Sequence, residues 1–562
     1  MTSEAKIIMN KENYLSIIPL GGLGEFGMNM MLFEYRDDIV IIDAGMMFPH
    51  QDMYGVDLVV PDITYLLQNR EKVRAVVLTH GHEDHIGGLP YLLQQLNVPI
   101  YGTKLTMSLV SNRLREFNLL SEVELHEITP RDRIQLGVFD FEFIHVSHSI
   151  PDTVGLAIHT PVGVVIHSGD FKLDQTPVDG KVLDFHKLTE FGDKGVLLLL
   201  LDSTNAERAG YSGSERDIFP HLEQIFQSAK QRLFLSTFAS SIHRIQQFIE
   251  LAYKYHRYIA VSGRSMVSNI RVAQEFGYLW VPDDIMIDVK DVMYCPPHEC
   301  MVLTTGSQGE PLSALSLMAV DDHAWMRIEA GDTVVISARI IPGHERDVDH
   351  IVDHLFRRGA IVIYERTAKV HVSGHGSQED LKLMMNLVRP KFFMPVHGEY
   401  RHLVYNARLA EKTGIHQENI IIAEDGDRIQ LTPESCENIG GIKTGWVFVD
   451  GKTIGELEGV VLRDRRQLAE DGFVIPIVVL NSQTGELVAE PDIVSRGFIY
   501  IDESEKLMNE AKELTKFVLD KLNIEEKSAS TIVQEELRTT LRRFFRKNTD
   551  RRPIIIPVVM RC

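Results

Sequence analysis

Four candidate metal ligands lie within six positions of one short segment, Thr79–Gly88, which reads THGHEDHIGG. They are His80, His82, Asp84 and His85. Neutral imidazole and carboxylate groups are ligands that zinc favours, and four of them on one turn are best accommodated by a cation. The alternative is a solvated polar loop. Further candidate ligands elsewhere in the chain favour the metal site.

The segment lies where a strand should end. It follows the apolar run Val73–Leu78, which has the length of a buried strand, and precedes the helix-like LPYLLQQL. Other candidate ligands also follow short apolar runs, as in IVIID, FEFIHVSH, GVVIHSGD and FFMPVH. An α/β scaffold gives this repeated pattern when one rim of its sheets carries the site. The ligands at these ends are Asp43, His148, Asp170 and His397.

These motifs, complete and in this order, resemble the metallo-β-lactamase family. The resemblance implies that His80, His82 and His148 hold one metal. It implies that Asp84, His85 and His397 hold a second, with Asp170 bridging the two. Asp43 would orient a ligand histidine. The implied cofactors are two Zn²⁺ per chain, with Mn²⁺ as the alternative.

The spacing of the ligands indicates an inserted domain. His397 lies 227 positions after Asp170, far more than a simple hydrolase of this fold needs. The residues between about 210 and 370 contain the strand-like runs LFLSTF, YIAVSG, VLTTGS, VVISAR and IVIYE. Helix-length amphipathic segments such as SIHRIQQFIELAYKY lie between several of them. This alternation predicts a mostly parallel sheet with covering helices.

The motifs that flank the insertion resemble those of the β-CASP nucleases. They are DSTNAE, which begins at Asp202, and HVSGHGS at His371–Ser377. Three further segments, GGLGEFGMN, LRDRR and SRGFIY, extend the resemblance along nearly the whole chain. Taken together, the motifs resemble those of the bacterial ribonuclease J family. The implied fold is an α/β metallo-β-lactamase αββα sandwich with an inserted β-CASP α/β domain and a small C-terminal α/β domain. The expected boundaries are residues 1–208, 209–370 and 371–445, a linker at 446–464, and 465–562.

The resemblance implies a metal-dependent ribonuclease. It would degrade RNA from the 5′ end, prefer a 5′-monophosphate, cut internally as well, and act in mRNA decay and rRNA 5′-end maturation. Two metals lower the pKa of water toward neutrality and polarise a phosphoryl oxygen, so the products would be a 5′-phosphate and a 3′-hydroxyl. By the same resemblance Asp202 is the proton donor to the leaving oxygen and His375 its partner. On its residues alone, the DSTN segment is better explained as a turn or a helix cap, both of which this composition favours.

Several turns rich in glycine and serine follow strand-like runs and could donate backbone N–H groups to phosphates. The resemblance places the RNA end against two of them, and SGRSM adds a basic residue. A pocket for a monophosphate would be too small for a triphosphate. The residues expected there are Ser240, Ser241, Ile242, Arg264, His371, Val372, Ser373, Gly374 and His375.

Two further expectations come from the resemblance. Gly55, Asp57 and Asp450 match positions that hold a structural Ca²⁺, a hard cation that takes oxygen ligands; the alternative is turn aspartates. The C-terminal segment, with VIPIVVL, SEKLMNEAKELTKFVLDKL and PIIIPVVM, would support a homodimer or homotetramer, mixed with a paralogue in some assemblies, and contact with an RNA-degradation complex.

Composition agrees with a cytoplasmic, multidomain protein. The chain has 562 residues, no apolar run near 18 residues and only four cysteines. Its N-terminus lacks the apolar core of a signal peptide. Cys295 and Cys300 flank PPHE without the second pair that a zinc knuckle needs. The net charge of −21 predicts weak non-specific RNA binding, so affinity must come from a shaped channel.

Three other functions are compatible with parts of the sequence. Gly22, Gly24 and Gly27 satisfy the dinucleotide-binding spacing, but strands rather than a helix are expected next. The chain could be another metallo-β-lactamase-fold hydrolase, such as a nuclease acting on DNA or an enzyme that hydrolyses small esters. Enzymes of this fold that hydrolyse small esters lack the insertion, which disfavours that alternative. A preference for DNA over RNA as substrate would identify a DNA nuclease. It could also be a catalytically silent paralogue that acts as an assembly subunit, although such paralogues usually lose metal ligands.

Overall fold

The computed structural model describes residues 13–50, 53–310, 312–341, 344–450, 453–454, 459–499 and 505–562. These residues divide into two compact units. The first contains the described residues up to Phe48 and from Leu58 to Val447, and the second contains those of Pro49–Asp57 and Phe448–Cys562. Within the described part of the chain, no helix has the length and apolar character needed to cross a membrane.

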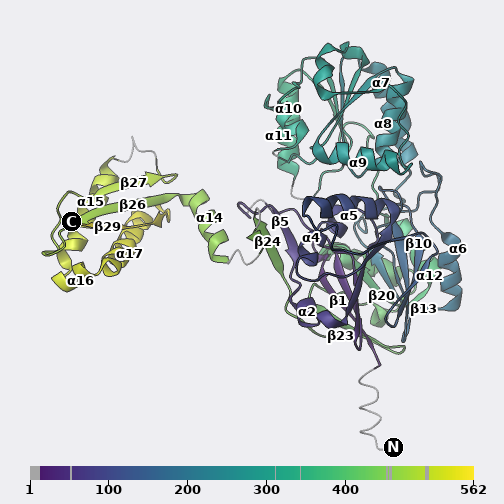
Figure 1. The fold of residues 1–562 in the computed structure, drawn as a ribbon, viewed down its shortest axis with the longest axis horizontal. Helices are drawn as coiled ribbons and strands as arrows, with labels where there is room; N and C mark the ends of the chain where they lie inside the picture. The colour runs from purple at the N-terminus through teal and green to yellow at the C-terminus, as the bar shows by residue number, and fades with distance from the viewer. Residues whose placement is uncertain are drawn as a thin grey trace, which may run out of the picture. The chain divides into compact units, whose positions relative to one another are not determined.

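Two facing sheets form the centre of the first unit (Figure 1). The first has the order β23-β22-β1-β3-β4-β6-β7-β8 and the second the order β20-β13-β12-β11-β10-β9. The first comprises β1 (Leu15–Gly21), β3 (Met30–Tyr35), β4 (Asp38–Ile42), β6 (Val73–Val77), β7 (Ile100–Thr103), β8 (Leu125–Ile128), β22 (Asp427–Leu431) and β23 (Cys436–Gly441). The second comprises β9 (Arg133–Leu136), β10 (Phe139–His145), β11 (Val154–Thr160), β12 (Gly163–His167), β13 (Val196–Asp202) and β20 (Pro390–Val396).

The strands are apolar on both faces because both faces are covered. Successive side chains of a strand point to opposite faces, so Phe33 of β3 joins the core between the sheets while Leu32 joins the core under the helices. Phe139, Phe141 and Phe143 of β10 fill the layer between the sheets in the same way. The covering helices of the first sheet are α4 (Leu89–Leu93) and α5 (Lys104–Glu116). Those of the second are α6 (Phe185–Lys194), α12 (Gln378–Val388) and α13 (Tyr400–Lys412).

This layering confirms the αββα sandwich expected from the sequence. The strands that follow the glycine motif exclude the dinucleotide-binding alternative. The glycine motif leads through the short β2 (Leu23–Gly24) into β3, where a dinucleotide site would require a helix. The strands expected after the glycine motif are present as β3 and β4, which are joined by a turn at Arg36.

The inserted domain has its own six-stranded sheet, in the order β16-β15-β17-β14-β18-β19, and every pairing in it is parallel. Helices cover both of its faces (Figure 1), as predicted. One face carries α7 (Phe219–Ser228), α8 (Ile242–Lys254) and α9 (Arg264–Glu275), and the other α10 (Ala314–Ala319) and α11 (Glu345–Arg357). The strands are β14 (Leu233–Ser236), β15 (Tyr258–Ser262), β16 (Met286–Ile287), β17 (Cys300–Thr304), β18 (Thr333–Ile336) and β19 (Ile361–Tyr364).

The chain leaves the sandwich after β13 and returns to it at α12 and β20. β20 then pairs in parallel with β13, and the register sets Asp202 opposite Val396. His397 therefore begins its turn beside Asp202, although the two are far apart in the sequence. This pairing closes the gap that the insertion opens between the ligands.

The second unit is a small α/β fold. Burial alternates along β26 (Phe473–Leu480), so one face of its sheet is covered, and α15 (Glu505–Lys521) and α17 (Ser530–Thr549) supply the cover. The strands flanking β26 are β27 (Asp492–Arg496), β28 (Ile554–Ile555) and β29 (Val558–Arg561), and the other helices are α14 (Gly459–Asp471) and α16 (Ile524–Ser528). Further short helices and strands in the described residues are α2 (Thr64–Gln68), α3 (Glu83–Ile86), β5 (Leu58–Pro61), β21 (Gly398–Glu399), β24 (Trp446–Asp450) and β25 (Thr453–Ile454). The domain boundaries expected from the sequence remain a prediction.

Candidate metal centre

The structure brings all seven expected metal ligands to one rim of the sandwich. Each lies in a turn directly after a strand or at the start of the helix that follows: His80 and His82 after β6, Asp84 and His85 in α3, His148 after β10, Asp170 after β12 and His397 after β20. Close packing holds the first of these turns in place. A Cβ added to Gly45 would lie 1.7 Å from the Asp84 carbonyl oxygen, so only glycine fits there.

One group of ligands consists of His80, His82, His148 and Asp170. His80 Nε2 lies 2.9 Å from His82 Nδ1, and His148 Nε2 lies 3.2 Å from the same atom. Asp170 Oδ2 is 3.7 Å from His80 Nε2 and 3.9 Å from His148 Nε2. A single ion bound to nitrogens at about 2.0–2.1 Å requires spacings of this size.

A second group consists of Asp84, His85, Asp170 and His397. Asp84 Oδ2 lies 3.5 Å from His85 Nε2 and 3.4 Å from His397 Nε2. Asp170 Oδ2 lies 3.3 Å from His85 Nε2 and 3.6 Å from His397 Nε2. The same Asp170 oxygen thus faces both groups, as a carboxylate shared by two ions must.

In four of the five histidines, the ring nitrogen that faces away from the centre forms a hydrogen bond that orients the ring. Asp43 orients two of them, His85 directly and His80 through Thr79. Asp43 adopts a left-handed conformation with φ 60°, and its Oδ2 accepts a hydrogen bond from His85 Nδ1–H at 2.8 Å. The same carboxylate accepts a hydrogen bond from the Thr79 hydroxyl, whose oxygen in turn accepts one from His80 Nδ1–H at 3.0 Å. Both rings therefore present Nε2 to the centre.

His148 and His397 are oriented in the same manner. His148 Nδ1 donates to the carbonyl oxygen of Gly374 at 2.8 Å. His397, also left-handed with φ 58°, donates Nδ1–H to the Thr204 hydroxyl at 2.7 Å, and that hydroxyl in turn donates to Asp202 Oδ1. Such partners fix the tautomer and the ring orientation of a metal ligand.

The electrostatics of the site suit divalent cations. Burial, with help from neighbouring imidazoles, holds the pKa of His80 and His148 well below the usual value, and burial lowers the pKa of His82 to about 4. These three rings are neutral at neutral pH and can act as ligands. Burial also lowers the pKa of His397, but Asp170 and Asp84 outweigh it and raise that pKa to about 9. The carboxylates thus attract positive charge, which two metal ions would supply.

Asp202 and His375 lie beside the centre as a hydrogen-bonded pair. His375 Nδ1 is 2.8 Å from Asp202 Oδ2 and 3.9 Å from Asp170 Oδ2. Asp202 is 1% exposed. Burial lowers the pKa of His375, but Asp202 and Asp170 more than offset this and raise it. The pair can hold a proton within a few ångströms of the reacting groups.

The expected RNA-end segment, residues 371–375, contacts an expected metal ligand directly. Besides the bond from His148 to Gly374, a Cβ at Gly374 would lie 2.7 Å from His148 Cε1, so the close approach requires glycine. The second expected segment, Ser240–Ile242, leads into α8. Ile242 and Val372 share one apolar core, and Arg244 donates to His371 Nδ1 and the Val372 carbonyl oxygen.

Arg264 is not brought into this network. It begins α9, and in the described part of the chain no hydrogen bond or ion pair joins it to residues 371–375. Sequence reasoning missed Thr79, Thr204, Asn205, Arg244 and Arg339, which all orient parts of the site. Thr79, Thr204 and Asn205 belong to motifs already recognised, so the signal was available. Arg339 carried none.

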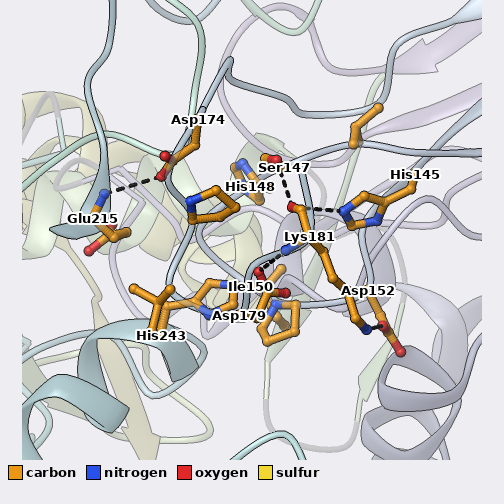
Figure 2. Close-up of a pocket in the computed structure, with 14 residues that line it drawn as sticks. His145, Ser147, His148, Ile150, Asp152, Asp174, Asp179, Lys181, Glu215 and His243 are labelled. Atoms are coloured by element: carbon orange, nitrogen blue, oxygen red, sulfur yellow. Dashed lines mark hydrogen bonds and ion pairs between the residues drawn. The ribbon is translucent and has the colours of Figure 1, made fainter. Parts of the chain in front are cut away.

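A narrow pocket lies behind His148, between the sandwich and the inserted domain (Figure 2). Ser147 and Lys181 line one side, and Glu215 and His243 line the other. The Glu215 amide donates to Asp174 across the gap at 3.2 Å. In this conformation the pocket has room for about one water molecule.

The expected calcium residues lie close to an arginine. Arg465 donates to the Gly55 carbonyl oxygen at 3.1 Å and to Asp450 Oδ2 at 2.5 Å. The Asp57 amide donates to the Val449 carbonyl oxygen at 2.9 Å. No described group of three metal-binding side chains includes Asp57, Asp450, Cys295 or Cys300.

Comparisons with known proteins cover most of the chain. Residues 23–206 match the family described as "Metallo-beta-lactamase superfamily" and residues 230–355 match "Ribonuclease J, beta-CASP domain". Residues 361–422 match "Zn-dependent metallo-hydrolase RNA specificity domain" and residues 460–562 match "Ribonuclease J C-terminal domain".

Curated relatives match at nearly full length. The chain is 44% identical to "Ribonuclease J" of Thermus thermophilus, covering 98% of this chain and 96% of that one. It is 41% identical to "Ribonuclease J2" of Bacillus subtilis, covering 98% and 99%. A solved structure of a protein of unknown function from Enterococcus faecalis has a TM-score of 0.52 at 17% identity, covering 74% of this chain and 100% of that chain, and shows the fold alone.

Proposed function

The chain belongs to the ribonuclease J family of metallo-β-lactamase-fold ribonucleases, and from that premise we propose that it degrades RNA from the 5′ end, prefers a 5′-monophosphate and also cuts internally. Its roles would be mRNA decay and rRNA 5′-end maturation. The observation that carries the proposal is the bond from His148 to Gly374. This hydrogen bond connects the segment that would bind the RNA end to a proposed metal ligand. It would thereby set the distance between the bound 5′ end and the scissile bond.

The proposed cofactors are two Zn²⁺, with Mn²⁺ as the alternative, held by the two ligand groups that share Asp170. A pair of such ions supplies Lewis-acid polarisation of a phosphoryl oxygen and a lower pKa for water. The chain's own residues orient the substrate and handle protons. Asp202 and His375 would deliver a proton to the departing 3′ oxygen. They lie beside the shared carboxylate of Asp170, and neither belongs to the two four-ligand groups that contain it.

The end pocket would combine residues 371–375 with Ser240–Ile242, and Arg264 would contribute charge only if it moves toward them. The pocket of Figure 2 supports this assignment, because its lining includes His148, which donates to Gly374, and His243, which follows Ile242 in the chain. The two sides of this small pocket would have to separate before a nucleotide could enter. The extra phosphates of a triphosphate would then displace the scissile bond from the metals.

The test is an end-labelled single-stranded RNA with a 5′-monophosphate, a 5′-hydroxyl or a 5′-triphosphate. We expect mononucleotides from the monophosphate, released about tenfold or more faster than from the triphosphate, since one lost charge-assisted hydrogen bond costs about 1.5–3 kcal/mol. Changing Ser240→Ala together with Ser241→Ala should narrow this preference and spare internal cuts. Equal rates on all three ends, with only internal fragments, would make the protein an endonuclease. A DNA strand in the same assay separates the ribonuclease from a DNA nuclease.

The alternative of a catalytically silent paralogue is disfavoured by the ligands. All seven are present and converge, whereas an assembly subunit would tolerate their loss. Cleavage at a rate no higher than that of a chain without bound metal would favour it.

Unit 2 would mediate assembly as a homodimer or homotetramer, mixed with a paralogue in some cells, and contact an RNA-degradation complex. All seven proposed zinc ligands precede the longer part of this unit, Phe448–Cys562, in the sequence. A chain that ends near residue 460 should therefore form smaller assemblies in sedimentation experiments while keeping its bound metal. An unchanged mass class would contradict the assignment.

A structural Ca²⁺ at Gly55, Asp57 and Asp450 is also proposed, with Arg465 as its competitor for the same oxygens. Elemental analysis after dialysis against calcium measures it directly.

A further inference from the structure

Arg339, just after β18, is connected to the RNA-end segment through one residue. Its Nη1 donates to Asn205 Oδ1 at 2.8 Å. The amide of Asn205 in turn donates to Ser373 Oγ at 2.7 Å and to the His375 carbonyl oxygen at 2.9 Å. A cation from the inserted domain therefore lies beside residues 371–375, where the sandwich contributes Asn205.

Four cations act on His371 of this segment. Arg208 lies near Arg339, because its amide donates at 2.9 Å to the carbonyl oxygen of Asn205, the residue that Arg339 contacts. Burial lowers the pKa of His371, and the charges of Arg244, Arg339, Lys172 and Arg208 lower it further. Two of these cations have carboxylate partners. Arg244 Nη2 lies 2.7 Å from Glu215 Oε1, and Lys172 Nζ lies 3.6 Å from Asp174 Oδ2.

The other two, Arg339 and Arg208, are half-buried, and neither has an ion-pair partner among the described residues. Among the described residues, Arg339 donates one hydrogen bond from its side chain, to Asn205, and most of its guanidinium donors have no described acceptor. Glu365 and Glu207 act on Arg339 through space without an ion pair, and Glu207 lies 3.4 Å from Arg401. Partly desolvated cations without a counter-charge are costly, and an anion would offset that cost.

We propose that Arg339 and Arg208 form a phosphate-binding site for RNA on the Asn205 side of residues 371–375. Guanidinium groups bind phosphate oxygens through paired N–H donors, so two of them suit one phosphate. The phosphate is either the 5′-terminal group or an internucleotide phosphate farther along the strand. The inference rests on the proposed function, because it takes RNA as the substrate.

The test measures RNA binding by the full chain, loaded with zinc and carrying Asp202→Asn to slow cleavage. A 3′-fluorescent single-stranded RNA is titrated at several salt concentrations. Arg339→Gln and Arg208→Gln should each raise Kd about tenfold. Each should also reduce the slope of log Kd against log salt by about 0.7, the value for one lost phosphate contact on a single strand. Arg357→Gln, an exposed arginine of α11, is the matched control and should change neither quantity.

Two RNA ends identify the phosphate. If the site binds the terminal phosphate, the effect of both variants disappears with 5′-hydroxyl RNA. If it binds an internucleotide phosphate, the effect persists on both ends. Either result supports the site.

Other outcomes would overturn it. If Arg339 only holds Asn205 in place, Arg208→Gln will bind RNA normally and Asn205→Ala will reproduce the loss seen with Arg339→Gln. Unchanged Kd and slope in both arginine variants would equally remove the site, while leaving the proposed function intact. The proposed function is tested separately, by how fast the chain without substitutions cleaves RNA with each of the three 5′ ends.

Discussion

An Asp202→Asn variant is expected to cleave RNA at least about a hundredfold more slowly than the unchanged chain, with the same metal content. The asparagine keeps the size of the side chain and can still accept from Thr204, which orients His397. It cannot carry the proton that Asp202 and His375 share across 2.8 Å. Loss of a positioned acid or base costs about 10²–10⁴ in rate.

Single-turnover cleavage and elemental analysis of the same sample give both quantities. His375→Ala should behave alike, and Asp193→Asn, which changes an exposed aspartate of α6, serves as the control. Because Asp202, His375 and His397 also lie close enough together to hold an ion, a fall in metal content alongside activity would reassign Asp202 as a ligand. Near-normal turnover with normal metal would remove it from the chemistry.

The second large effect is expected at Asp170. Its Oδ2 lies within 3.3–3.9 Å of the Nε2 atoms of four histidines, one pair in each ligand group. Asp170→Asn replaces the shared negative charge by a neutral amide, so we expect the unchanged chain to retain two ions and the variant one or none. Cleavage should then fall below detection, because both ions contribute to the same step.

Metal content is measured after reconstitution with zinc and, separately, with manganese, followed by removal of loosely bound ions. A matched sample of Asp193→Asn should retain two ions and full activity. If Asp170→Asn keeps both ions, the shared carboxylate is wrongly assigned. If even the unchanged chain holds no metal after reconstitution, the two-metal chemistry is wrong.

The local parts of the site could be predicted from the sequence because their geometry is local. His80, His82, Asp84 and His85 occupy one turn, and the strand before it is plain from its apolar run. The parallel sheet of the insertion could be predicted for the same reason. His397 was placed by family resemblance. The physical basis of that placement, the pairing of β20 with β13, appears only in the fold.

Contacts between distant segments could not be predicted. Arg339 stands in a run, SARIIPG, with no recognisable motif, and its role depends on the insertion meeting Asn205. Arg465 was visible in LRDRR, but nothing in the sequence showed that it would reach Gly55 and Asp450. Such partners depend on how separate elements dock, and hydrophobic periodicity does not encode docking.

The pairing of β20 with β13 also has a consequence for biosynthesis. A ribosome adds about 5–20 residues per second, so the strand that carries His397 emerges tens of seconds after the turn that carries His80. During that interval the second ligand group lacks His397, and His375 is also missing from beside Asp202. We therefore expect the growing chain to be inactive as a nuclease until the strand that carries His397 has been made. In that case the inserted domain, which lies between the two halves of the site in the sequence, also delays the onset of activity.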